Sequence, residues 1–204
     1  MSLKTLILKN HTELEHNIEN IIQHGLELIR SKSQLLNNDK KDLIIEGLLL
    51  RACAYWEEFL EKEVIYLVEI DQSKIIQELE LPANVRLNRR VIKAILFSNT
   101  YKSFHDIERS MNFFKTYISD NSNLFIGLPK DLLKKNQMVY TLRNYLAHHS
   151  EFAEKKLRQE YNKTFGYTRF MQPGRFLTKD DGKHFKGLVH NFCLISATMR
   201  SNLK

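Results

Sequence analysis

The chain has 204 residues, of which 43% are hydrophobic and 27% are charged. This composition excludes an intrinsically disordered protein and predicts one globular domain over residues 1–204. The formal net charge of +7 favours an anionic partner such as nucleic acid, although many basic proteins only carry a solvated basic surface. No signal peptide and no stretch of roughly 18 apolar residues is visible, so we expect a soluble, cytoplasmic protein with no membrane partner.

Long helices are the first structural expectation. Seven glycines and three prolines are few for this length, so turn signals are sparse. Apolar residues recur at helical spacing over residues 6–36 and 41–70, which predicts two long helices. Residues 37–39 are typical of a turn, with Asp39 as the cap of the second helix. We expect Trp56 to pack in the core rather than to bind a cofactor.

Shorter helices follow along the rest of the chain. Two capping boxes, Ser103–Asp106 and Thr178–Asp181, indicate helix starts, and Pro129 suits a first helical turn. An irregular loop or small hairpin is expected near residues 165–177, where glycine and proline interrupt the pattern. The predicted fold class is all-α, an up-and-down bundle whose remaining helices cover residues 73–81, 86–97, 103–118, 129–150, 151–162 and 178–199.

One short stretch, TLRNYLAHHS at residues 141–150, combines side chains suited to chemistry on a phosphate. A metal-free ribonuclease must remove the proton of a ribose 2′-hydroxyl, protonate the leaving 5′-oxygen and stabilise the charge that develops at phosphorus. Histidine suits the proton transfers near neutral pH. Arginine suits the phosphate because its planar donors reach two oxygens at once. Arg143 and His148, separated by four residues, are therefore the candidate catalytic pair.

Helical geometry limits how this pair can act. On an ideal helix Asn144 and His148 share a face, whereas Arg143 and His148 lie about 140° apart. One isolated copy is therefore a poor active site. Two arrangements stay open: two copies facing each other across a twofold axis, or a helix break near Ala147 that brings the pair together.

These residues resemble a known family. The R-N-x-L-A-H pattern from Arg143 to His148 is similar to the R-x4–6-H motif on a late helix of the HEPN superfamily. The segment LLLRACAYWEEFLEK, residues 48–62, is similar to the long second helix of several HEPN families. The resemblance covers residues from about 40 to 160, and the RiboL-PSP-HEPN and MAE-type families come nearest. It implies a HEPN-like helical bundle.

The resemblance also implies an activity. It implies an endoribonuclease, active as a homodimer without metal or cofactor, that leaves a 2′,3′-cyclic phosphate and a 5′-hydroxyl. Arg143 would hold the scissile phosphate, His148 would be the general acid or base, and Asn144 would orient one of them. His149 would be either a substitute base or a mere neighbour. Such a protein would be a bacterial toxin or an antiviral defence effector, with an antitoxin or regulatory protein as a further partner.

One position departs from the family pattern. HEPN toxins paired with nucleotidyltransferase antitoxins often carry a tyrosine two residues after the histidine, and here that residue is Ser150. A switch that works by tyrosine adenylylation is therefore not expected at this position.

Basic residues outside the motif are candidates for RNA contacts, namely Lys134, Lys135, Arg89 and Arg90. A solvated helix face is the alternative for each cluster. No metal site is predicted, because His190 and Cys193 are only three residues apart and no second pair of ligands accompanies them.

Two further functions stay open beside the ribonuclease. The first is a non-catalytic HEPN module that binds RNA or a partner protein through the same basic groove. The second is a helical structural protein in which Arg143 and His148 only hold a dimer interface by hydrogen bonds.

Overall fold

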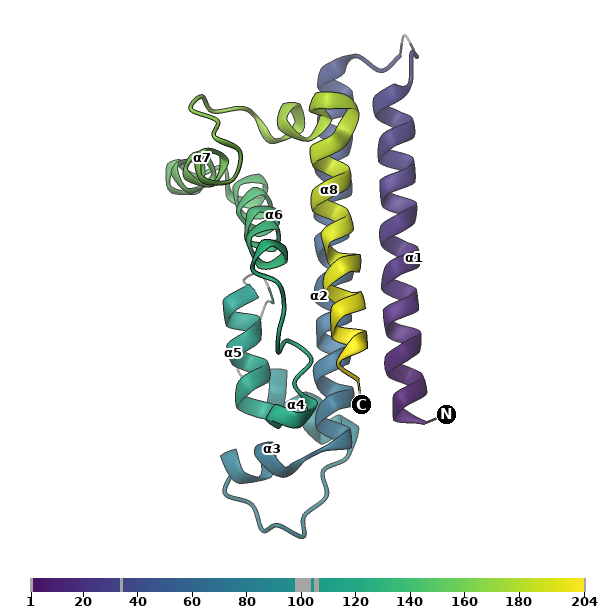
Figure 1. The fold of residues 1–204 in the computed structure, drawn as a ribbon, viewed down its shortest axis with the longest axis vertical. Helices are drawn as coiled ribbons and strands as arrows, with labels where there is room; N and C mark the ends of the chain where they lie inside the picture. The colour runs from purple at the N-terminus through teal and green to yellow at the C-terminus, as the bar shows by residue number, and fades with distance from the viewer. Residues whose placement is uncertain (1, 34, 98–103, 105–106, 204) are drawn as a thin grey trace. The chain divides into compact units, whose positions relative to one another are not determined.

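The structure, a computed structural model, describes residues 2–33, 35–97, 104 and 107–203. Within these residues the regular secondary structure is helical and contains no strand, which confirms the predicted all-α fold class. A short 3-10 turn, η1 (Asp120–Ser122), lies between the fifth and the sixth α-helix. The α-helices, coloured in chain order in Figure 1, are α1 (Leu3–Arg30), α2 (Asn38–Ile70), α3 (Ser73–Glu78), α4 (Arg89–Phe97), α5 (Ile107–Tyr117), α6 (Lys130–His148), α7 (Glu151–Phe165) and α8 (Pro173–Ser201).

The chain divides into two compact units. Unit 1 comprises Met1–Leu14, Trp56–Leu128 and Ile195–Lys204, and unit 2 comprises Glu15–Tyr55 and Pro129–Leu194. The long helices α1, α2 and α8 each contribute one part to either unit. The expectation of a single domain over the whole chain stays a prediction.

Unit 1 has an aromatic and aliphatic core. Trp56 is fully buried and stacks on Phe59 with the ring centroids 5.3 Å apart, which confirms the predicted core role of Trp56. Phe114 packs edge-on against Phe125, with centroids 4.5 Å apart, and so joins α5 to the segment after η1. Burial of such rings stabilises the unit by roughly 1.5–3 kcal/mol for each large side chain.

A buried polar cluster crosses this core, consisting of Asn10, His11, Glu63 and Ser196. Asn10 Nδ2 donates to Glu63 Oε1 at 2.8 Å, and His11 Nδ1 lies 2.7 Å from Ser196 Oγ. His11 Nε2 and Glu63 Oε2 are 3.9 Å apart, and both side chains are 0% exposed. Two ionisable groups thus lie next to each other without access to water.

Unit 2 is held by close contacts between long helices. α1 runs unbroken through Gly25, where an added Cβ would overlap the ring of Phe185 on α8. At the start of α8, Arg175 makes ion pairs of 2.9 Å with Asp39 and 3.0 Å with Asp42 on α2. These contacts fix the ends of α1, α2 and α8 that belong to this unit.

Two helix starts differ from the prediction because other side chains cap them. Asn37 Oδ1 accepts from the backbone N–H of Lys40 at 3.0 Å, whereas Asp39 lies inside the first turn of α2, so the prediction of Asp39 as the cap was wrong. Asn88 Oδ1 accepts from Val91 N at 3.0 Å, which places the start of α4 three residues later than predicted. Residues 103, 105 and 106 of the predicted capping box lie outside the described residues.

The predicted capping box at 178–181 was wrong as well. Thr178 Oγ1 donates to Asp42 Oδ1 at 2.9 Å and is therefore not a cap. α8 already begins at Pro173, so the predicted loop near 165–177 shrinks to 166–172 and forms no hairpin. The hydroxyl of Thr178 is used in a tertiary hydrogen bond to Asp42, which the local sequence does not reveal.

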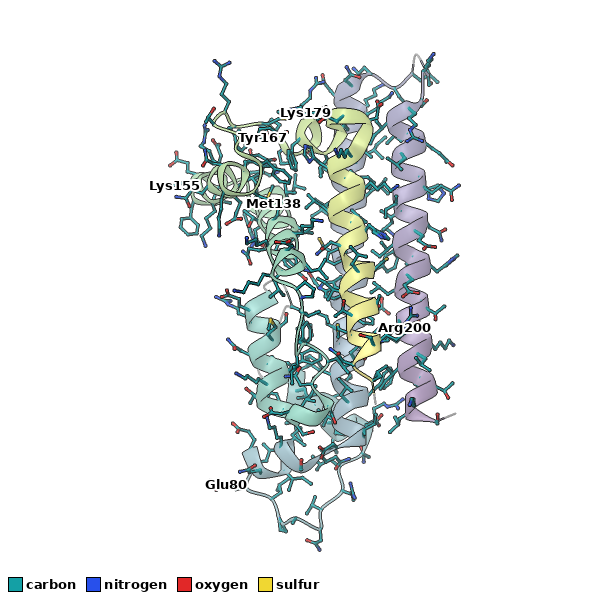
Figure 2. All side chains as sticks on the ribbon, in the orientation of Figure 1. Glu80, Met138, Lys155, Tyr167, Lys179 and Arg200 are labelled. Carbon is teal, nitrogen blue, oxygen red and sulfur yellow. The ribbon has the colours of Figure 1, made fainter. Side chains whose placement is uncertain are left out.

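A break inside α8 replaces the predicted helix start. Residues 179–182 are non-helical, and Gly182 has φ 78°, a conformation that favours glycine. An added Cβ there would lie 2.6 Å from Ile29 Cδ1 on α1. Lys179 Nζ donates to Tyr167 OH at 3.2 Å, and Figure 2 shows the two residues side by side at this break.

Two glycines of α8 should respond oppositely to alanine. At Gly174 an added Cβ would lie 2.9 Å from the Cα of Asp42, which is backbone and cannot turn away. We expect Gly174→Ala to lower the free energy of unfolding by about 1–3 kcal/mol. At Gly187 nothing lies within 4 Å, so Gly187→Ala should raise it by about 0.5–1 kcal/mol through helix propensity. Urea denaturation of both variants checks this; equal stability of the two would contradict the close approach of α2 and α8.

None of the described helices is both long enough and apolar enough to cross a membrane.

Candidate functional site

The stretch at residues 141–150 forms the end of α6 and the turn into α7. α6 ends at His148 because His149 adopts a left-handed conformation, with φ 44° and ψ 29°. The backbone N–H of His149 still donates to Tyr145 O at 2.8 Å. Ser150 then caps α7, its Oγ accepting from Ala153 N at 3.2 Å. The two adjacent histidines therefore stand in different backbone conformations.

The candidate catalytic residues lie at the accessible end of α6. Arg143 and Asn144 are half-buried and His148 is exposed. Their side chains make no hydrogen bond or ion pair with any residue in the described part of the chain. Because α6 is unbroken through Ala147, Asn144 and His148 share a face and Arg143 remains offset from them. The helix breaks at His149, two residues after Ala147, so Arg143 and His148 both belong to the unbroken helix.

His149 is exposed like His148, but its ring has an aromatic partner. Its ring meets the ring of Tyr145 edge-on, with centroids 5.3 Å apart. Tyr145 OH in turn donates to Gln172 Oε1 at 3.3 Å, and the Tyr145 ring also contacts Phe170. The second histidine is thus oriented by an aromatic neighbour that the loop before α8 holds in place.

A carboxylate that the sequence analysis missed lies near His149. Glu46 on α2 accepts a 2.7 Å hydrogen bond from the backbone N–H of Gly174. Burial raises the pKa of Glu46, and Asp42 raises it further, while the Gly174 hydrogen bond and the nearby His149 lower it. Burial also raises the pKa of Tyr161, helped by the charge of Glu46 and by Tyr145. A carboxyl group, two phenols and the His149 imidazole therefore interact with one another beside the end of α6.

No local pattern could have indicated these partners. Glu46 lies on a helix that precedes the motif by almost a hundred residues, and helical periodicity does not tell which face of α2 meets the end of α6. Tyr161 appears in the sequence only as one of several aromatic residues on α7.

The predicted RNA-contacting residues divide between the two units. Lys134 and Lys135 are exposed on α6, in unit 2, and roughly 12–14 Å before Arg143 along the helix axis. Arg89 and Arg90 lie in unit 1, where Arg90 is exposed. Arg89 makes a bidentate pair with Glu69, with Nη2 and Oε2 2.6 Å apart. This ion pair neutralises Arg89 and makes it a weaker candidate than the two lysines.

Within the described residues no three histidine, cysteine or acidic side chains come together in a way that could hold a metal ion. Burial raises the pKa of Cys193 to about 12. The thiol is therefore protonated at neutral pH, and thiolate chemistry at this position is not expected.

The chain matches no family model, no curated protein sequence and no solved structure. Its function therefore has to be argued from its own residues.

Proposed function

We propose that the chain is a HEPN-type endoribonuclease that works without a metal in the bacterial cytoplasm, as a toxin or an anti-phage defence effector. The observation that supports this most is the state of Arg143 and His148. Both lie at the accessible end of α6, and within the described chain neither is engaged by another side chain. Cleavage of RNA requires an arginine that can bind the phosphate and a histidine that can transfer a proton.

The proposed cleavage removes one proton from the substrate and returns one to it. One histidine removes the proton of the ribose 2′-hydroxyl as the 2′-oxygen attacks phosphorus. The bond from phosphorus to the 5′-oxygen then breaks, and a second histidine protonates that oxygen. The products are a 2′,3′-cyclic phosphate and a 5′-hydroxyl. Arg143 donates to the non-bridging oxygens, where negative charge grows in the transition state.

A second copy supplies the second histidine. Arg143 and His148 are offset from each other on one helix, so a homodimer with a twofold axis near the end of α6 would place two Arg143 and two His148 side chains in a single cleft. Lys134 and Lys135 would extend the basic surface of this cleft. An antitoxin or regulatory protein would act by covering it.

The fraction of dimer and the specific cleavage activity should therefore both fall as the protein concentration is lowered. Light scattering should give a mass about twice the 24.2 kDa of the chain, and specific cleavage activity should fall as dilution produces monomers. An active monomer with an undiminished rate would contradict the composite site. A stable dimer that cleaves no RNA would instead favour a module that only binds.

A further inference from the structure

An exposed aromatic residue stands next to the motif. Phe152 is the second residue of α7, and its side chain is 68% exposed. The buried residues of α7 are Ala153, Leu157 and Tyr161, and Phe152 does not belong to this buried face. Four Cα–Cα steps of about 3.8 Å separate Phe152 from His148, so their Cα atoms are less than about 15 Å apart.

Basic residues continue the outer face of α7 behind this ring. At 100° per residue, Lys155, Lys156, Gln159 and Lys163 fall within about 60° of Phe152 on the helical wheel. All of them are exposed, and no acidic residue falls within this arc. We call these five residues the α7 stripe. Figure 2 shows Lys155 on the side of α7 that faces outward.

The charges of the α7 stripe are largely available. Lys155 and Lys156 make no ion pair with the described residues, whereas Lys163 lies 3.7 Å from Glu160. Lys156 Nζ lies 4.6 Å from the centroid of the Phe152 ring. An ammonium group and a largely exposed aromatic ring therefore stand together, one suited to a phosphate and the other to a base.

We propose that the α7 stripe is a binding subsite for single-stranded RNA, in which Phe152 stacks on an unpaired base and Lys155 and Lys156 contact the adjoining phosphates. The inference rests on the proposed ribonuclease function and adds to it the place where the strand runs. Stacking on Phe152 needs a base whose face is free, and a base inside a duplex has none. The subsite therefore selects unpaired strands near the scissile phosphate and is tolerant of base identity.

Binding should be measured with RNA that cannot be cleaved. The probe is a fluorescein-labelled 2′-O-methyl RNA of mixed sequence, which lacks the attacking hydroxyl, used single-stranded and annealed to its complement. Phe152→Ala should weaken single-strand binding about tenfold, whereas Phe152→Trp should keep it within about twofold. The double variant Lys155→Ala/Lys156→Ala removes two phosphate contacts and should therefore reduce the slope of log K against log salt concentration by about 1.4. Leu43→Ala is the matched control, because Leu43 is a 69% exposed apolar residue on α2 outside the α7 stripe.

The results separate the subsite from the ribonuclease. Binding of Phe152→Ala at wild-type strength, or equal affinity for the duplex, would overturn the subsite even if the wild-type protein cleaves RNA. Binding that follows the expected order would support the subsite, even if ordinary RNA of the same sequence is left intact and the ribonuclease proposal fails. A stripe that binds no nucleic acid and only a protein partner would contradict the inference.

Discussion

Alanine in place of either Arg143 or His148 will reduce RNA cleavage by about a hundredfold or more. A general acid or base contributes about 10²–10⁴-fold, and the loss of one charge-stabilising donor costs about 10²–10³-fold. Because His148 is exposed, Arg143 is half-buried, and neither side chain forms a hydrogen bond or ion pair with the described residues, the variants should unfold close to the wild-type temperature. Initial rates on a labelled RNA, with melting curves beside them, are the measurement.

Matched controls exist in the same unit. Arg30, the exposed last residue of α1, and His190, exposed on α8, are replaced by alanine in parallel. Both control variants should cleave at the wild-type rate. Equal cleavage by His148→Ala and His190→Ala would remove His148 from the chemistry.

Stability will fall as pH rises from about 6.5 to 8, because of the buried polar cluster in unit 1. Burial raises the pKa of Glu63 to about 8, against an opposing hydrogen bond from Asn10. Burial, and then the charge of Arg200, lower the pKa of His11 to about 4. Between these values the folded pair holds one proton, whichever of the two residues carries it.

The sign follows from comparison with the unfolded chain. With ordinary pKa values of 6.5 for His11 and 4.5 for Glu63, the unfolded pair also holds one proton between pH 4.5 and 6.5, so stability is constant there. Above pH 6.5 the unfolded pair has lost its proton while the folded pair keeps it until about pH 8. The free energy of unfolding should therefore fall by about 2 kcal/mol across these 1.5 pH units.

Urea denaturation at several pH values measures this slope. Glu63→Gln keeps the shape of the side chain and removes its proton, so the variant should lose most of the decrease above pH 6.5. The same slope in wild type and Glu63→Gln would show that another group titrates in this range.

The sequence predicted the helices well because apolar periodicity reflects which face is buried, and this signal persists over long segments such as 41–70. It failed at helix starts, where several side chains compete for the same backbone N–H groups. Asn37, and not Asp39, caps α2. Thr178 donates its hydrogen bond to Asp42, a residue that only the fold brings near.

The sequence also predicted only part of the candidate site, namely the residues that lie close together along the chain. Local spacing indicated Arg143, Asn144 and His148 because they lie on one helix. Glu46 and Tyr161 come from other helices, and their nearness to His149 depends on how those helices pack. The different backbone conformations of the two histidines also follow from the α6–α7 turn, which the sequence analysis had treated as continuous helix through residue 150.

The central claim, cleavage of RNA without a metal, is tested most directly by incubating the purified protein with RNA in excess EDTA and mapping the product ends. The account predicts cleavage that leaves 2′,3′-cyclic phosphates and 5′-hydroxyls. Cleavage that appears only when Mg²⁺ is restored, or that leaves 3′-hydroxyls and 5′-phosphates, would contradict it.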